Sequence, residues 1–147
     1  MNKTSSEVLF CYDETMNILF VCQANVGRSQ AAMEIYRQKG GMAQSAGTKV
    51  DTPGATLAER PGAFNIVEIM KEDFGINMIN NIRTQITEDI VDGFDKIVVM
   101  AEHDTVPEWL SKDTRAEFWT VNDPKGQDID TTRRIVHEIE AKVNQLI

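Results

Sequence analysis

A cysteine and an arginine six positions apart are the residues whose types and spacing point most directly to chemistry. Cys22 and Arg28 enclose a short polar loop. The backbone N–H groups of such a loop converge on the oxygens of a phosphate-like dianion, and the planar guanidinium of Arg28 matches two of those oxygens. Cys22 then lies beneath the phosphorus as a nucleophile. We interpret the run as a phosphate-binding loop, whose expected substrate-binding residues are Gln23, Ala24, Asn25, Val26, Gly27, Arg28 and Ser29.

The segments on either side of this loop place it at the start of a helix. The apolar run 17–21 predicts a strand, and residues 29–39 have a helical pattern that two glycines close. Free N–H groups and the dipole at a helix N-terminus favour negative charge. They therefore favour the thiolate that a nucleophilic cysteine needs. The alternative is that Cys22 is a small buried hydrophobe at the end of a core strand, but the polar residues of the same turn count against it.

Two other residues of the loop have both a functional and a purely structural interpretation. Ser29 either donates a hydrogen bond to the sulfur of Cys22 or simply caps the helix. Asn25 lies in the middle of the loop, where asparagine tolerates a left-handed backbone. Its side chain would then tie the loop to a neighbouring segment, and otherwise Asn25 is a generic turn residue.

A thiolate attack on a phosphate ester also needs an acid for the departing oxygen, and Asp123 is the candidate. Pro124 holds Asp123 in an extended conformation. The run 117–121 predicts a strand directly before it, and open α/β sheets bind ligands at the carboxyl ends of their strands. Asp-Pro alone indicates only a turn, so the assignment depends on Cys22 and Arg28.

Predicted strands alternate with predicted helices along the chain. We expect strands at 17–21, 42–46, 96–100 and 117–121, and helices at 29–39, 63–74, 105–110 and from Asp130 to the C-terminal end. This alternation predicts an α/β fold in which a four-stranded parallel sheet carries helices on both faces. The phosphate-binding loop then joins strand 1 to helix 1. Residues 1–15 are expected to be a flexible arm, and residues 16–147 the folded domain.

Length and composition favour one acidic domain in the cytoplasm. The 147 residues suffice for one sizeable core. A net charge of −8 argues against a nucleic-acid partner, and no apolar run approaches the ~20 residues of a membrane-spanning helix. No signal peptide is visible, and two cysteines, Cys11 and Cys22, fit a reducing compartment. His103 and His137 have no further ligands at suitable spacing, so we expect neither a metal site nor a cofactor.

The loop of Cys22, Arg28 and Ser29 after an N-terminal strand, with an Asp-Pro loop near the C-terminus, resembles the low-molecular-weight protein tyrosine phosphatases. Thioredoxin-coupled arsenate reductases share that fold. The resemblance covers residues 16–147. It implies that Cys22 is the nucleophile, Arg28 the phosphate clamp and Asp123 the general acid. It also implies a network that supports the loop, formed by Asn25, Ser29, Ser45 and Asn81.

The chain departs from the family pattern at several positions. Gly27 stands where many members have a second cysteine, so the protective disulfide is absent. Lys125 and Gly126 follow the Asp-Pro pair where phosphatases often have aromatic residues, and residues 49–51 lack an aromatic as well. Asn81 replaces a loop-supporting histidine, with its amide expected to hydrogen-bond Ser45. Members that act on phosphoarginine tend to have threonine at the position of Val26, which counts against that substrate.

We therefore expect a cofactor-independent phosphatase that acts on phosphate monoesters, with protein phosphotyrosine as the expected substrate, through a phosphocysteine intermediate. A phosphorylated protein or a small phosphate ester is the expected partner. One alternative is an arsenate reductase that uses a small-molecule thiol, because no cysteine follows Cys22 to relay a disulfide. Another alternative is a module that binds phosphate without turnover, and the presence of Cys22, Arg28 and Asp123 counts against it.

Overall fold

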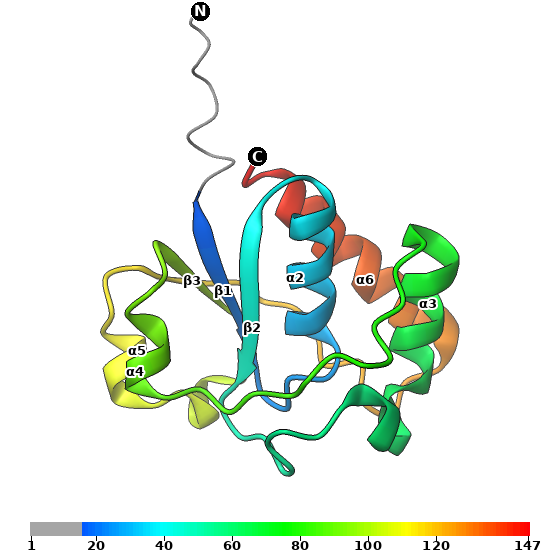
Figure 1. Cartoon of the computed structure of the whole chain (residues 1–147), viewed down its shortest axis with the longest axis horizontal. Helices are drawn as coiled ribbons and strands as arrows, with labels where there is room; N and C mark the ends of the chain where they lie inside the picture. Colours follow the sequence, from blue (N-terminus) through cyan, green and yellow to red (C-terminus); the bar gives the residue numbers. More distant parts are fainter. Residues whose placement is uncertain (1–15) are drawn as a thin grey trace, which may run out of the picture.

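A computed structural model describes residues 16–147. Its centre is a four-stranded sheet in the order β2-β1-β3-β4, with every neighbouring pair parallel (Figure 1). The prediction of a four-stranded parallel sheet is confirmed. The strands are β1 Asn17–Cys22, β2 Met42–Gly47, β3 Lys96–Val99 and β4 Ala116–Phe118.

Helices cover both faces of the sheet, as the alternating pattern predicts. The three long helices pack together on one face, and two single-turn helices lie on the other (Figure 1). The long helices are α2 Arg28–Gln38, α3 Phe64–Phe74 and α6 Ile129–Asn144; the short ones are α4 Glu88–Val91 and α5 Glu108–Ser111. Three 3₁₀ turns join them, η2 Leu57–Glu59, η3 Pro61–Ala63 and η4 His103–Thr105. Among residues 16–147, no helix combines the length and apolar character that crossing a membrane requires.

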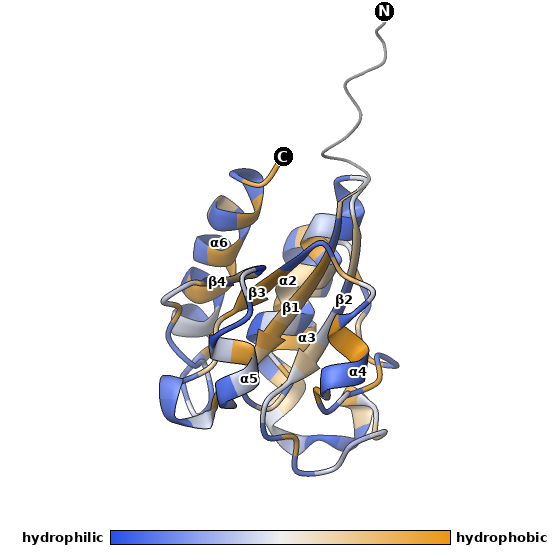
Figure 2. Ribbon diagram, turned by 90° about the vertical axis from the view of Figure 1, so that its left-hand side faces the viewer, coloured by the Kyte–Doolittle hydropathy of each residue, from blue (hydrophilic) through white to orange (hydrophobic). Residues whose placement is uncertain are grey.

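The central strand β1 explains why the sheet has helices on both sides. Ile18 and Phe20 pack toward α2, α3 and α6, whereas Leu19 and Val21 pack toward α4 and α5, and all four are fully buried. Burial of one such side chain is worth roughly 1.5–3 kcal/mol. A strand buried on both faces reads as a continuous apolar run, and Figure 2 shows the hydrophobic strands enclosed between the helices.

Strand order places a crevice directly beyond Cys22. The chain leaves β1 toward β2 on one side, whereas β3 and β4 lie on the other side of β1. Loops that leave β1 and β3 therefore diverge toward opposite faces, and open α/β sheets bind ligands at such a switch point. The loop after β1 and the residues after β3 meet at this edge of the sheet.

Three predicted elements differ from the structure by more than one residue at a boundary. Asp128, not Asp130, caps α6, because its Oδ1 accepts a hydrogen bond of 2.8 Å from the backbone N–H of Thr131. β4 ends at Phe118 and does not continue to residue 121, because the carbonyl of Val121 turns to accept a hydrogen bond from Nη1 of Arg28. The predicted helix 105–110 is divided into the turn η4 and helix α5, with Pro107 at the N-cap of α5.

Candidate active site

Cys22 is the last residue of β1, and its sulfur faces the start of α2. The thiol is buried, and its Sγ lies 3.0 Å from Oγ of Ser29. Gly27 occupies the N-cap position of α2 and Ser29 lies inside the helix, so the purely capping interpretation of Ser29 is wrong. The Ser29 hydroxyl is placed to stabilise a negative charge on the sulfur.

Asn25 holds the curvature of the loop. It is fully buried and adopts a left-handed backbone with φ of 56°. Its side-chain Nδ2 donates to Oγ of Ser29 at 2.8 Å and to Oγ of Ser45 at 3.0 Å. Its Oδ1 accepts from the backbone N–H of Thr84 at 2.7 Å. One side chain thus joins the loop to α2, to β2 and to the segment after α3.

The guanidinium of Arg28 is fixed by acceptors in the segments that directly follow β3 and β4. Nη1 donates to the carbonyl oxygens of Met100, at 2.6 Å, and Val121, at 3.1 Å. Glu102 binds both terminal nitrogens, with distances of 3.0 Å to Nη1 and 3.1 Å to Nη2. Burial acts to lower the pKa of Arg28, but the hydrogen bonds to Glu102 and the charges of Cys22 and Asp123 outweigh it, so the pKa is raised. The arginine is held as a permanent cation.

Glu102 is a site residue that sequence reasoning missed. It follows β3 at the same sheet edge as Cys22, and hydrogen bonds from Arg28 lower the pKa of its carboxyl group. A carboxylate just beyond the end of a central parallel strand is the signal that could have revealed it. Its side chain is partly exposed.

Asp123 lies across the same cavity from the loop. Its Oδ2 is 3.7 Å from Nη2 of Arg28, and its Oδ1 accepts a hydrogen bond of 3.0 Å from the backbone N–H of Lys125. The side chain is 43 % exposed, so it reaches both solvent and a bound ligand. This is the position from which a carboxyl group can exchange a proton with a departing oxygen.

The cavity has a volume of about 680 Å³, which is more than a phosphate group fills. Cys22, Arg28 and Asp123 all line it. Its remaining wall includes Phe64, which is the most exposed large hydrophobic residue among those described, at 69 %. Residues 49–51 and 125–126 predict a cavity mouth without an aromatic residue, but Phe64 at the start of α3 supplies one.

Asn81 does not contact Ser45, and that prediction is wrong. Its Nδ2 donates instead to Oε1 of Gln30 at 3.1 Å and to Oε2 of Glu34 at 2.7 Å. Gln30 in turn donates through Nε2 to the backbone oxygen of Asn25, at 3.3 Å. Asn81 is therefore connected to the phosphate loop through Gln30.

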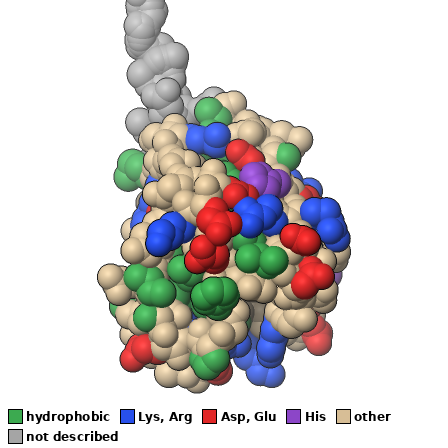
Figure 3. Space-filling model, turned by 90° about the vertical axis from the view of Figure 1, so that its right-hand side faces the viewer, with side chains coloured by type: hydrophobic (Ala, Val, Ile, Leu, Met, Phe, Trp, Pro, Cys, Tyr) green, Lys and Arg blue, Asp and Glu red, His purple; other side chains and the backbone are tan. Residues whose placement is uncertain are grey.

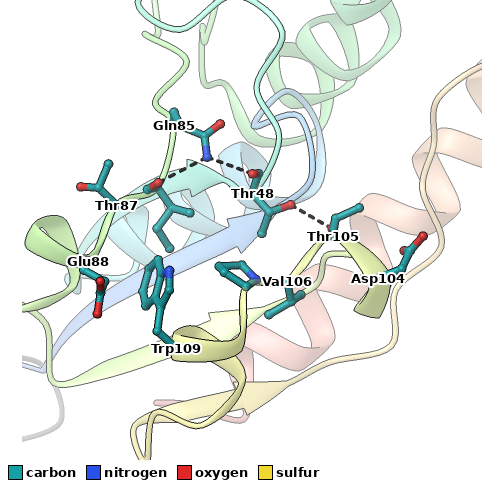
Figure 4. A pocket seen from close by; sticks show the side chains of 10 residues that line it. Thr48, Gln85, Thr87, Glu88, Asp104, Thr105, Val106 and Trp109 are labelled. Atoms are coloured by element: carbon teal, nitrogen blue, oxygen red, sulfur yellow. Dashed lines mark hydrogen bonds between the residues drawn. The ribbon is translucent and has the colours of Figure 1, made fainter.

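A second hollow of about 410 Å³ lies on the α4 and α5 side and contains no part of the phosphate loop (Figure 4). Gln85 spans it, with Nε2 donating to the carbonyl of Thr48 at 2.9 Å. The hydroxyl groups of Thr48 and Thr105 are 2.9 Å apart and join the loops that follow β2 and β3. Trp109 lines this hollow and packs in the core, as expected for a packing residue. These contacts hold together the segments that follow β2 and β3.

No group of metal-ligating side chains occurs within residues 16–147. Trp119 packs against Phe20 and donates its indole N–H to Glu117 at 2.8 Å, and it is absent from the cavity wall. Cys11 lies outside the described residues. The cavity thus brings together the Cys22 thiol, the Arg28 guanidinium and the Asp123 carboxyl group beside the loop at the start of α2.

Comparisons with known proteins agree with this arrangement. The model of the family "Low molecular weight phosphotyrosine protein phosphatase" matches residues 17–147. A putative arsenate reductase of Halobacterium salinarum is 28% identical over 137 residues, which are 91% of this chain and 92% of that protein.

Solved structures of similar fold include a low molecular weight protein tyrosine phosphatase of Bacillus subtilis, with 25% identity and a TM-score of 0.69; the match covers 89% of this chain and 94% of that one. The YwlE arginine phosphatase of Geobacillus stearothermophilus has 22% identity and a TM-score of 0.74, with 89% and 90% of the two chains covered. Because the family match spans nearly all described residues, this chain belongs to the low molecular weight phosphotyrosine protein phosphatase family, a family of phosphatases.

Proposed function

We propose that this protein hydrolyses phosphate monoesters in two steps through a phosphocysteine. The observation that carries the proposal is one cavity in which Cys22, Arg28 and Asp123 meet, with the sulfur 3.0 Å from the Ser29 hydroxyl at the start of α2. Family membership supports phosphatase chemistry, and the geometry assigns a part to each residue.

In the first step, a bond forms between the Cys22 sulfur and phosphorus while the bond from phosphorus to the ester oxygen breaks. The carboxyl group of Asp123 gives its proton to that oxygen, and the alcohol leaves. In the second step, the Asp123 carboxylate takes a proton from water, whose oxygen bonds to phosphorus as the sulfur–phosphorus bond breaks. Inorganic phosphate leaves, and the thiolate and the protonated Asp123 are restored.

Arg28 has one edge for Glu102 and another for the phosphoryl group. Glu102 binds the edge formed by Nη1 and Nη2. Among the described residues no hydrogen bond engages Nε, so the edge formed by Nε and Nη2 is available to two phosphoryl oxygens. A bidentate contact of this kind follows charge that builds on the oxygens in the transition state.

Phosphotyrosine is the substrate that the cavity supports best. Phe64, Pro61 and Pro124 line the cavity above the phosphate loop and offer apolar surface to an aromatic leaving group. Phosphoarginine would need acceptors for its guanidinium, but Asp51 at the mouth is already paired with Arg60 and Arg83. The tyrosine phosphatase from Bacillus subtilis and the arginine phosphatase from Geobacillus stearothermophilus are both similar to this chain in fold. The choice between phosphotyrosine and phosphoarginine therefore rests on measured rates.

The test compares initial rates on para-nitrophenyl phosphate, a phosphotyrosine peptide, a phosphoarginine peptide and arsenate. We expect the phosphotyrosine peptide to give the highest kcat/KM of the biological substrates. The Cys22→Ser variant should lose turnover on every substrate while still binding inorganic phosphate, since Arg28 and the loop amides are unchanged. A variant that kept more than a few per cent of the wild-type rate would exclude Cys22 as the nucleophile.

Arsenate reduction is the second candidate, because a putative arsenate reductase is among the relatives. No cysteine follows Cys22 in the sequence, so a thioredoxin-linked relay through this chain lacks its second thiol. We expect no turnover of arsenate with thioredoxin and its reductase as the only reductant. Sustained thioredoxin-dependent reduction would overturn the phosphatase proposal.

A further inference from the structure

The carbonyl oxygens of the phosphate loop are bound from outside the loop, one after another. Cys22 and Gln23 accept from the backbone N–H groups of Thr48 and Lys49, both at 2.8 Å. Ala24 accepts from Nη2 of Arg83 at 3.0 Å. Because C=O and N–H point in opposite directions in a trans peptide, each contact turns the following N–H toward the interior of the loop. The three N–H groups turned inward belong to Gln23, Ala24 and Asn25.

Arg83 is the only one of these outer partners that acts through a charged side chain. It is 1 % exposed, and its Nη2 also binds Oδ1 of Asp51, a residue that lines the mouth of the active-site cavity. Hydrogen bonding from Arg83 lowers the pKa of the Asp51 carboxyl group, and Arg60 shares the same oxygen at 2.7 Å. The ion pair therefore joins the cavity mouth to the backbone of the loop.

Burial of Arg83 is costly and has no evident role in packing the core. Its Nε is buried without a hydrogen-bond partner among the described residues. Arginine is almost never fully buried unless it is paired, and an unsatisfied buried donor destabilises the fold. Neighbouring Thr84 binds the Asn25 side chain through its backbone N–H, so residues 83 and 84 hold the Ala24 carbonyl and the Asn25 side chain, which are adjacent in the loop.

We propose that Arg83 is a positioning residue for phosphate binding. It fixes the Ala24–Asn25 peptide through the Ala24 carbonyl, so that the Asn25 N–H faces the bound oxyanion, and Asp51 holds Arg83 in place. The proposal rests on the proposed function in that the oxyanion is the phosphoryl group of the substrate. Arg83 itself does not touch the reacting atoms.

The test uses the full chain and measures the affinity for inorganic phosphate by calorimetry, alongside thermal unfolding and kcat and KM. Arg83→Met removes the contact to Ala24 while keeping most of the side-chain volume. Arg115→Met is the matched control, because Arg115 also binds two backbone carbonyls, of Val91 and Phe94, and a carboxylate, of Asp113, far from the cavity. Arg83→Lys keeps the charge but loses the planar fork.

We expect Arg83→Met to weaken phosphate binding about tenfold or more, as the loss of a hydrogen bond from a charged group implies. Arg115→Met should lower the melting temperature and leave the phosphate affinity as in the wild type. Arg83→Lys should fall between the wild type and Arg83→Met, because its ammonium keeps the charge but sits on a flexible stem and does not hold the fixed direction that the planar guanidinium gives to Nη2. If Arg83→Met does not fold, the weaker phosphate binding of Arg83→Lys decides.

Wild-type phosphate affinity in Arg83→Met, or in Arg83→Lys where that variant decides, would overturn the positioning role. Equal weakening by Arg83→Met and Arg115→Met would also overturn it, because the effect would then be one of general stability. The two proposals can be told apart. A wild-type protein that binds phosphate but does not hydrolyse any monoester would refute the proposed function and leave the Arg83 result valid.

Discussion

At the scale of single residues, Arg28 has to be both rigid and available. Its guanidinium meets two backbone carbonyls and Glu102, so little freedom is left to lose when phosphate binds. Preorganised donors of this kind stabilise transition-state charge without reorganisation. Glu102 also adds a negative charge near the phosphoryl group, so its net effect depends on whether alignment outweighs repulsion. The geometry favours alignment, since the carboxylate binds the edge of Arg28 that faces away from the ligand.

Glu102→Gln tests this balance. We expect kcat/KM to fall about tenfold, because the loss of a charged hydrogen bond loosens the guanidinium. Glu117→Gln is the control, since Glu117 also pairs with a cation, Lys96, at a sheet edge away from the cavity. Steady-state rates of the two variants on para-nitrophenyl phosphate give the comparison. A rise in kcat/KM for Glu102→Gln would mean that repulsion dominates.

Asp123→Asn tests the proton donor separately from the fold. The side chain is partly exposed, so the variant should unfold at nearly the wild-type temperature. Rates should fall by roughly 10²–10⁴-fold for ordinary phenyl phosphates, whose oxygen needs a proton as it departs. A strongly acidic nitrophenol leaves as an anion and should suffer less. Burst-phase release of phenols with different pKa values measures the first step, and equal losses for all of them would remove Asp123 from the acid role.

At the scale of elements, the loop that carries Asp123 and Pro124 packs against the phosphate-binding loop at Gly27. A Cβ atom on Gly27 would lie 3.1 Å from Cγ of Pro124, so Pro124 would have to move by a few tenths of an ångström. The α3 helix is joined to the same loop, because Asn65 donates to the carbonyl of Gln127 at 3.3 Å. The position of Asp123 is thus set by contacts from two other elements.

Gly27→Ala should displace the loop that carries Asp123 and leave the phosphate-binding loop in place. We expect kcat to fall several-fold, since small displacements of reacting groups are costly, while the affinity for inorganic phosphate stays close to that of the wild type. Gly93→Ala is the control, because a Cβ there meets no neighbouring atom within 4 Å. Loss of phosphate binding in Gly27→Ala would show that the substitution distorts the loop itself.

The parts of the site that sequence reveals lie within short motifs, namely the loop of Cys22 to Ser29 and the Asp123-Pro124 pair after a predicted strand. Cys22, Asn25, Arg28 and Ser29 fall within one turn between a strand and a helix, so their spacing alone predicts their meeting. Glu102 meets Arg28 across 74 positions, and only its place just beyond β3 distinguishes it from the other carboxylates of the chain. The predicted hydrogen bond from Asn81 to Ser45 is replaced by hydrogen bonds to Gln30 and Glu34 of α2, and such long-range partners depend on how the elements pack.

The fold follows the same rule. The apolar run of β1 and the stripe of Ile135, Val136 and Ile139 in α6 predict buried elements, and these residues are buried. The ends of elements were less predictable, because they depend on tertiary partners. β4 stops where Val121 turns its carbonyl to Arg28, and Asp128 caps α6 through a single hydrogen bond.

At the scale of the whole molecule, a charged cluster ties α3 to α6 on the face that Figure 3 shows, where acidic, basic and histidine side chains lie side by side. His137 of α6 contacts Oδ2 of Asp73 through Nε2 and Oε1 of Glu140 through Nδ1, both at 2.8 Å. Arg133 also binds Asp73 and, at 2.8 Å, Glu72, and the ring of Phe74 stacks on His137. The hydrogen bond that the imidazolium of His137 donates to Asp73, followed by the one that it donates to Glu140, raises the pKa of His137.

A raised histidine pKa makes this tie between α3 and α6 stronger at low pH. The contribution of His137 to the free energy of unfolding is fully present below the ordinary histidine pKa of about 6.5, and it is lost as the pH rises through the higher value of the folded state. His137→Gln should therefore lower the melting temperature more at pH 6 than at pH 9. The effect should be modest and should shrink with salt, because the side chain is 46 % exposed. His103→Gln is the control, since the His103 ring stacks on Phe118 and has no ion pair with a carboxylate among the described residues. A destabilisation by His137→Gln that stays constant or grows with pH would show that the imidazolium does not hold these two helices together.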